Sequence, residues 1–318
     1  MYGVSPAYFY SSYGPEFRPS DIEAALPGIR ELGFENFQPE AFRRDAAESW
    51  TERDSASLAA RARDLGLSTG PFVAHWLGAE FSTPDALGRR GLTDDAPRAL
   101  AIASSLGGAP VFSVPLPALA LPGAAGTALD RVRAELRGAL VEKLGLLAEA
   151  AREAGFRPAL ELLPGNVLGG SAEFLNLRSI PGLENLGLVL DTGHFHAMGE
   201  DVPALPSRMG GSIAATHLCD NDGIENLSLA PGAGNIPFRP LLVELAASGY
   251  AGSLDLEIVC APGDVTREYR NALKTLRGME AAEPSRKSET DPATPSDGIP
   301  EPMTARGPGV RGFERSTL

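Results

Sequence analysis

Four short apolar segments in the later half of the chain each end in a side chain that can bind a metal ion or move a proton. These side chains are Glu161, Asp191, His217 and Glu257. They are separated by about the length of one strand-plus-helix unit. If the four strands are neighbours in one parallel barrel, their ends converge and the side chains meet around a point. Three carboxylates and an imidazole form a ligand set for one divalent metal ion, namely Mn, Mg, Co or Zn.

Each of the four residues also has a structural interpretation. Asp191 could only cap a turn, where Asp is common, and His217 could be a hydrogen-bonded core histidine. Glu161 and Glu257 lie among apolar neighbours, in the runs Ala-Leu-Glu-Leu-Leu and Leu-Asp-Leu-Glu-Ile. A buried carboxylate needs a partner, and a metal ion is one. We therefore predict that all four residues bind the ion.

The remaining histidines are candidates for contact with a substrate. His194 and His196 follow Asp191 within a few residues, and His75 stands beside Trp76 at the end of an earlier strand. We predict that His75, Trp76, His194 and His196 line the pocket. Support of the metal ligands is the alternative role for His194, and a place in a solvated loop is the alternative for His196.

Five other residues carry weaker signals. Asp220 and Asp222 fit best as residues that shape the loop after His217, and Cys219 fits a packing role because nothing nearby would activate a thiolate. Gln38 and Glu40 follow the second predicted strand and are the weakest candidates for a place in the site.

Strand-like and helix-like segments alternate along the chain and would position these residues. Eight strand-then-helix units favour an α/β fold, a closed (β/α)₈ barrel, over an open doubly wound sheet. A capping-box pattern at Ser20 and Glu23 predicts the start of the first long helix. Residues 1–280 would form this catalytic domain. Residues 281–318 are crowded with Pro, Ser, Thr, Gly, Glu and Arg, which predicts a disordered tail.

Composition restricts the partners. The chain has 318 residues, 43% of them hydrophobic, which suffices for one large domain. With a net charge of −13, the chain lacks the excess of basic residues with which nucleic-acid binders contact phosphates. Two cysteines, no signal-like N-terminal segment and no apolar run of membrane-spanning length predict a cytoplasmic protein. We expect a small-molecule carbohydrate partner, no nucleic acid and no membrane, with a homo-oligomer left open.

Four runs in this chain resemble the sugar phosphate isomerase/epimerase families of the xylose-isomerase-like TIM barrel superfamily. They are LVLDTGHFHAMG (188–199), HLCDNDG (217–223), LAPGAG (229–234) and GSLDLEI (252–258). The resemblance implies one divalent metal ion on Glu161, Asp191, His217 and Glu257, with His194 facing the substrate.

The chain also departs from those families. Asn226-Leu-Ser228 stands where relatives often have an Asp-x-His pair, and Cys219 replaces a second histidine. The Asn-Arg-x-Glu run of the ketose 3-epimerases is absent after Glu161, and the fourth strand ends in Ser113-Val-Pro. A trinuclear nuclease site of the endonuclease IV type cannot be assembled from these residues.

The chemistry that follows is proton transfer next to a carbonyl. A metal ion that chelates a sugar carbonyl and hydroxyl acidifies the adjacent C–H, and Glu161 and Glu257 would form the catalytic acid/base pair. We predict a metal-dependent isomerase or epimerase of a sugar, sugar phosphate or polyol, acting through an enediolate. The alternatives are a metal-dependent inosose-type dehydratase and a non-catalytic sugar-binding barrel, with a nuclease the least favoured.

Overall fold

The computed structural model describes residues 1–120 and 127–281. Residues 282–318, which make up almost all of the predicted tail, lie outside the described residues, as do residues 121–126 of the Leu-, Pro- and Gly-rich loop. The unit that contains the candidate site ends at Ala282. The predicted boundary at residue 280 and the disorder beyond it stay predictions.

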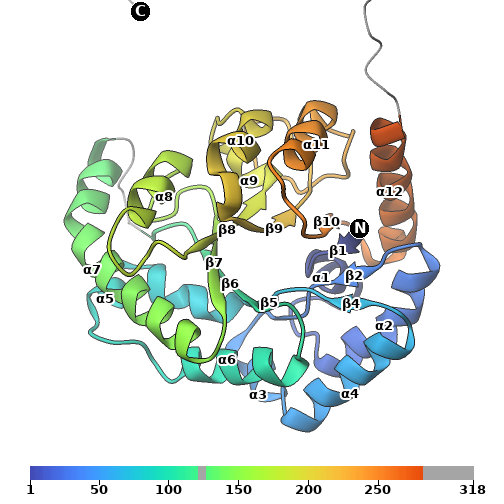
Figure 1. Ribbon diagram of the computed structural model, residues 1–318, viewed down its shortest axis with the longest axis horizontal. Helices are drawn as coiled ribbons and strands as arrows, with labels where there is room; N and C mark the ends of the chain where they lie inside the picture. The colour runs from blue at the N-terminus through green and yellow to red at the C-terminus, as the bar shows by residue number, and fades with distance from the viewer. Residues whose placement is uncertain (121–126, 282–318) are drawn as a thin grey trace, which may run out of the picture. The chain divides into compact units, whose positions relative to one another are not determined.

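Short parallel strands form a ring in this unit, and helices surround it (Figure 1). The strands are β1 (Tyr2–Val4), β2 (Asn36–Phe37), β3 (Glu40–Ala41), β4 (Ser68–Thr69), β5 (Phe72–Ala74), β6 (Val111–Leu116), β7 (Arg157–Leu162), β8 (Gly187–Asp191), β9 (Ile213–His217) and β10 (Leu254–Leu256). The second and third strand positions of the barrel are each split, into β2 with β3 and β4 with β5. The described strands therefore occupy the eight positions that the sequence predicts.

Hydrogen bonding divides the ring into two sheets. One has the order β10-β1-β2-β4 and the other β3-β5-β6-β7-β8-β9. The chain just after β9 closes the ring, because Leu218 N donates to Asp255 O at 2.7 Å and Glu257 N donates to Leu218 O at 3.0 Å. This closure holds Glu257 close to the carboxyl end of β9. The fold is therefore a (β/α)₈ barrel, as predicted.

The helices are α1 (Ala7–Tyr13), α2 (Pro19–Glu31), α3 (Arg44–Glu48), α4 (Glu52–Asp64), α5 (Pro84–Gly88), α6 (Asp95–Leu106), α7 (Thr127–Glu153), α8 (Ser171–Arg178), α9 (Thr192–Ala197), α10 (Leu205–Met209), α11 (Phe238–Ala247) and α12 (Val265–Ala281). Short 3₁₀ turns add η1 (His75–Phe81), η2 (Val202–Ala204), η3 (Gly210–Ser212) and η4 (Pro262–Asp264). The N-cap of the first long helix is Arg18, two residues before the predicted cap at Ser20. Arg18 precedes a proline, which favours an extended conformation there, and the Asp21 carboxylate accepts the Arg18 N–H at 2.8 Å.

The main hydrophobic core lies between the strand ring and the helices. Leu140, Leu144 and Leu147 of α7 are 2% exposed or less, so the leucine stripe of this helix packs inward. A much smaller apolar cluster of Ala159, Val189 and Ala215 comes from β7, β8 and β9. Polar side chains occupy other parts of the ring, and they are the ones that build the site.

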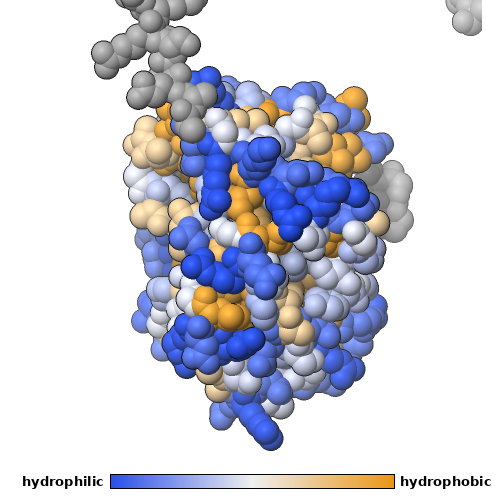
Figure 2. Space-filling model, turned by 90° about the vertical axis from the view of Figure 1, so that its right-hand side faces the viewer, coloured by the Kyte–Doolittle hydropathy of each residue, from blue (hydrophilic) through white to orange (hydrophobic). Residues whose placement is uncertain are grey.

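The molecular surface beside α12 and α2 is mainly polar (Figure 2). On the face beside α12 and α2, hydrophobic residues form separate small patches among polar and charged ones (Figure 2). None of the described helices combines the length and the apolar character that a membrane span requires.

Candidate metal and substrate site

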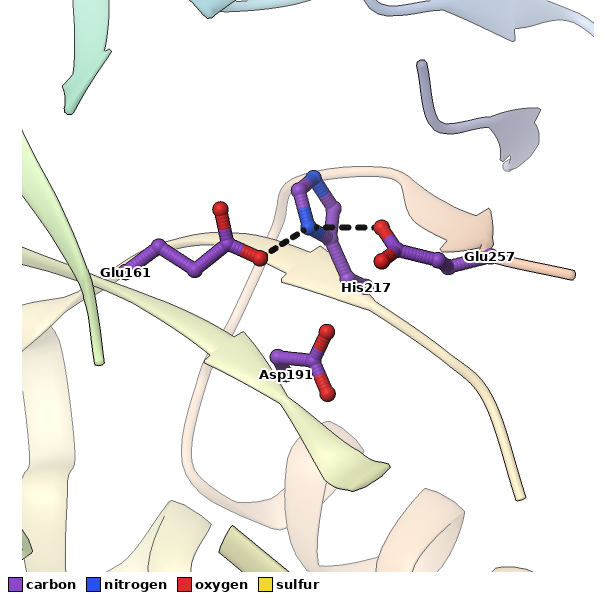
Figure 3. Close-up of side chains that lie close together, drawn as sticks. All are labelled: Glu161, Asp191, His217 and Glu257. Carbon is purple, nitrogen blue, oxygen red and sulfur yellow. Dashed lines mark hydrogen bonds and ion pairs between the residues drawn. The ribbon is translucent and has the colours of Figure 1, made fainter. Parts of the chain in front are cut away.

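Four side chains from neighbouring strand ends converge at one point. Glu161 comes from β7, Asp191 and His217 end β8 and β9, and Glu257 directly follows β10. Each offers one ligand atom, and these four atoms lie within 4.8 Å of one another. Figure 3 shows Glu161 and Glu257 on two sides of the His217 ring, with Asp191 beside them. The structure thus brings together the whole predicted ligand set.

His217 lies between two carboxylates. Its Nδ1 is 2.9 Å from Glu161 Oε1 and 2.9 Å from Glu257 Oε2. Burial disfavours the imidazolium, but the negative charges of Glu257 and Glu161 outweigh burial and raise the pKa of His217 well above its usual value. Burial likewise opposes ionisation of Glu161, yet the charge of His217 holds the pKa of that carboxyl below its usual range. The point between these groups therefore favours positive charge.

Asp191 has one oxygen engaged by the protein and one without a hydrogen-bond partner. Its Oδ1 accepts the N–H of His194 at 2.8 Å, which caps α9, and the thiol of Cys219 at 3.5 Å. Its Oδ2 has no hydrogen-bond partner among the described residues, although Asp191 is fully buried. Burial, the largest cause, raises the pKa of Asp191. An unpaired buried carboxylate oxygen is costly, and a cation at the convergence point would pair with it.

The residues present fit a divalent ion. Three carboxylates and one imidazole suit the borderline and hard divalent ions. A second unpartnered atom, His194 Nδ1, lies 3.5 Å from Asp191 Oδ2 and 3.7 Å from Glu161 Oε1. It is positioned beside the ligand set and not within it.

A cavity of about 330 Å³ opens next to the four residues. Its described lining is Pro6, Ala7, Tyr10, Glu40, Phe42, Val73, His75, Glu161, Leu163, His194, His217, Asn226, Leu227, Ser228, Glu257 and Val259. Glu161, His217 and Glu257 therefore face the cavity. Asp191 is absent from this lining and contributes only to the convergence point.

A second carboxylate–histidine pair stands in the same cavity. His75 Nδ1 lies 3.2 Å from Glu40 Oε1, and the His75 ring stacks on Phe42 with centroids 4.1 Å apart. Burial raises the pKa of Glu40. Burial opposes protonation of His75, but the hydrogen bond and charge of Glu40 raise the pKa of the imidazole. The pair fixes the ring in one orientation at the cavity wall.

Two of the four predicted substrate contacts reach the cavity and two do not. His75 and His194 line it. Trp76 is 7% exposed and packs edge-on to Phe72 in the core, because the 3₁₀ turn η1 begins at His75 and turns the next side chain away. His196 is half-buried on α9 and pairs with the side chain of Asn235, which lies in an exposed loop.

Sequence reasoning missed several cavity residues. Tyr10 and Phe42 gave no distinctive signal, whereas Asn226 and Ser228 attracted notice only as substitutes for metal ligands. Glu40, one of the weakest candidates from the sequence, also lines the cavity, and its spacing favours a place there. It is two residues after Gln38 and four after Asn36 on one strand position, and side chains at that spacing share a face.

The loop after β9 is organised by Asp220. Its two carboxylate oxygens accept the backbone N–H groups of Gly232, Gly234 and Ile236 at 2.9 to 3.0 Å. Asp222 accepts the N–H of Ile224 at 2.8 Å. These contacts agree with the interpretation of both aspartates as loop-shaping residues. Cys219 is fully buried against Asp191, and burial raises the pKa of its thiol well above the usual value, which fits a packing role.

The chain belongs to the xylose isomerase-like TIM barrel family, whose model matches residues 28–279. Among its relatives, an L-ribulose 3-epimerase from Mesorhizobium japonicum is 28% identical over 242 residues, which cover 75% of each protein. An inosose isomerase from Halalkalibacterium halodurans is 27% identical over 154 residues, covering 46% of this chain and 54% of that protein. The chain thus spans about half the length of several curated relatives that it matches.

Solved structures show the same fold. A structure of an L-ribulose 3-epimerase has a TM-score of 0.67 at 22% identity, covering 92% of this chain and 99% of that chain. The IOLI protein with a zinc atom has a TM-score of 0.65 at 17% identity, covering 87% of this chain and 95% of that chain. These likenesses concern the barrel as a whole.

Proposed function

We propose that this protein is a divalent-metal-dependent isomerase or epimerase of a sugar, sugar phosphate or polyol, acting by proton transfer next to a carbonyl. The observation that carries the proposal is the arrangement of Glu161 and Glu257. They lie on two sides of the His217 ring (Figure 3), and both line the cavity. A substrate in this cavity would have a carboxylate on each side.

The proposed ion is one Mn, Mg, Co or Zn held by Glu161, Asp191, His217 and Glu257. When bound, it would supply Lewis-acid polarisation of the substrate carbonyl, which acidifies the adjacent C–H. The unpartnered Asp191 Oδ2 and the 2.9 Å approaches of both glutamates to His217 support this assignment.

The proton transfers would be carried out by the two glutamates. One carboxylate removes the proton from the carbon next to the carbonyl and leaves an enediolate. Return of a proton to the other carbon isomerises the sugar. Return from the second carboxylate to the opposite face of the same carbon epimerises it. His194 and the Glu40-held His75 would bind substrate oxygens, since both rings line the cavity.

The relatives support this class of reaction. Their names are those of an L-ribulose 3-epimerase, an inosose isomerase and a fructoselysine 3-epimerase. One of the structures with the same fold contains zinc. The cytoplasmic location and the carbohydrate partner belong to the same proposal.

Turnover in D₂O tests the reaction type. A sugar panel should reveal a substrate that acquires deuterium on the carbon next to the carbonyl. Glu257→Gln and Glu161→Gln should each lower kcat by about 100-fold or more, since acid–base catalysis contributes at least that much. Glu225→Gln makes the same chemical change in an exposed residue outside the cavity lining and serves as the matched control.

Three outcomes would contradict the proposal. Wild-type turnover by either glutamine variant would show that its carboxylate is only structural. Retention of the substrate hydrogen would indicate a hydride shift, and a product that has lost water would identify a dehydratase. The metal is tested separately, because elemental analysis should find about one divalent ion per chain.

A further inference from the structure

A chain of buried polar side chains leads from His217 into the barrel, away from the cavity. The second ring nitrogen of His217, Nε2, lies 3.1 Å from Gln38 Oε1. The amide of Gln38 in turn donates from Nε2 to Asp255 Oδ2 at 2.6 Å. Gln38 and Asp255 are both 0% exposed, and neither belongs to the cavity lining. A role in contacting substrate is therefore excluded for both.

Asp255 is held in place by further donors. Asn36 Nδ2 donates to its Oδ1 at 2.9 Å, and Ser253 Oγ donates to its Oδ2 at 2.7 Å. The close approach of this carboxylate requires a glycine on the neighbouring strand β1. A Cβ at Gly3 would lie 1.9 Å from Asp255 Oδ1. The network is thus built into the strand packing.

The order of donors and acceptors determines which nitrogen of His217 faces the ion site. An ionised carboxylate can only accept hydrogen bonds. Asp255 therefore takes the NH₂ group of Gln38, which leaves the carbonyl oxygen of Gln38 for His217. That oxygen also only accepts, so Nε2 of His217 must carry a hydrogen. In the neutral ring the lone pair is then on Nδ1, the atom 2.9 Å from Glu161 and Glu257.

We infer that Gln38 and Asp255 are positioning residues that fix the tautomer and ring orientation of His217 for metal binding. The inference rests on the proposed metal site. Groups that hold a metal-binding histidine through its other nitrogen fix its tautomer, and their loss weakens metal binding by about 10- to 100-fold. Here an amide stands between the carboxylate and the histidine and transmits the orientation.

The test is a metal-binding measurement that does not depend on activity. Gln38→Met keeps the length of the side chain and removes its amide. Its dissociation constant for Zn²⁺, measured by chelator competition, should rise by about 10- to 100-fold over wild type. Its Co²⁺ absorption spectrum should also change, because the imidazole is no longer held in one orientation.

A second variant keeps the test decisive if Gln38→Met folds poorly. Asp255→Asn preserves shape but can donate as well as accept, so the amide of Gln38 is no longer fixed. It should weaken Zn²⁺ binding in the same direction by a smaller factor. Lys143→Met, which removes a buried charge on α7 outside the network, is the destabilising control and should leave the dissociation constant of the folded protein unchanged.

The outcomes separate this inference from the proposed function. A merely structural network would lower the melting temperature of Gln38→Met and leave its metal affinity and Co²⁺ spectrum like those of wild type, which would overturn the inference. If wild type itself binds no divalent ion, the proposed metal site fails. Weakened binding in both network variants, with an unaffected Lys143→Met, would support the assignment.

Discussion

Replacing Lys143 by Met should destabilise the fold by about 3 to 5 kcal/mol at neutral pH, the usual loss when one partner of a buried ion pair is removed. Lys143 is 2% exposed and Glu80 is 4% exposed, and the ammonium of one contacts the carboxylate of the other. Lys143 Nζ also donates to Ala86 O at 2.7 Å. The pair joins α7 to η1, the turn that begins at His75.

The size of this destabilisation follows from the contacts that Glu80 keeps when Lys143 is replaced. Glu80 keeps one backbone donor, the N–H of Thr93 at 3.3 Å, so its charge would be largely uncompensated. Protonation of Glu80 would remove this buried negative charge. From an ordinary pKa of 4.5, protonation at pH 7 costs about 3.4 kcal/mol, at 1.36 kcal/mol per pH unit. Loss of the Lys143 hydrogen bond to Ala86 adds about 1 kcal/mol.

The loss of unfolding free energy caused by Lys143→Met should depend on pH. In wild type, burial acts to raise the pKa of Glu80, but the hydrogen bond and charge of Lys143 outweigh burial and lower it. That contribution is present above the unfolded pKa and is lost as pH falls through the folded pKa. In Lys143→Met the pKa of Glu80 should instead be raised, so the variant gains stability as pH falls. The difference between the proteins should shrink by about 1.4 kcal/mol per unit from pH 7 to pH 5.

Urea unfolding followed by circular dichroism at pH 7 and pH 5 measures both effects. The double variant Glu80→Leu/Lys143→Met should be more stable than Lys143→Met alone, since it leaves no buried charge. A loss below about 1 kcal/mol at pH 7, the range of an exposed pair, or a loss that does not change with pH, would refute the picture of a desolvated pair.

Further substitutions test other parts of the structure. Gly3→Ala should lower both the melting temperature and the Zn²⁺ affinity, because its Cβ would collide with Asp255; unchanged values would show that β1 can move aside. His196→Ala should leave kcat/KM unchanged, and a large loss in a sugar assay would mean that this ring reaches substrate. Glu40→Gln should raise KM while sparing Zn²⁺ affinity, since it releases His75 and no proposed ligand. Deletion of residues 283–318 leaves the proposed ligands and the described cavity lining in place, so metal content and melting temperature should hardly change.

The sequence predicts the four convergent residues because each ends an apolar strand, and parallel strands place such ends together. It does not predict Gln38 in the same way. Gln38 matters through contacts with His217 and Asp255, about 180 and 220 positions further along the chain, and no local pattern encodes them. The case of Trp76 is different again. A tryptophan beside a strand-end histidine suits a pocket or a core equally, and the onset of a 3₁₀ turn at His75 decides for the core.

The second strand position of the barrel also has a consequence for folding. Asn36, Gln38 and Glu40 alternate along it and meet Asp255, His217 and His75 at successive heights, while Phe37 points outward against Phe9 of α1. A slip of one residue would exchange the inward and outward sets. Three polar side chains would then enter the apolar layer beneath the helices, and Phe37 would face carboxylates and imidazoles. A strand shifted by one residue would therefore lose stability in three ways: it would bury unpaired polar groups, lose the hydrogen bonds to His217 and His75, and disrupt the packing of Phe37. The polar interior of the barrel thus helps to specify the alignment of this strand.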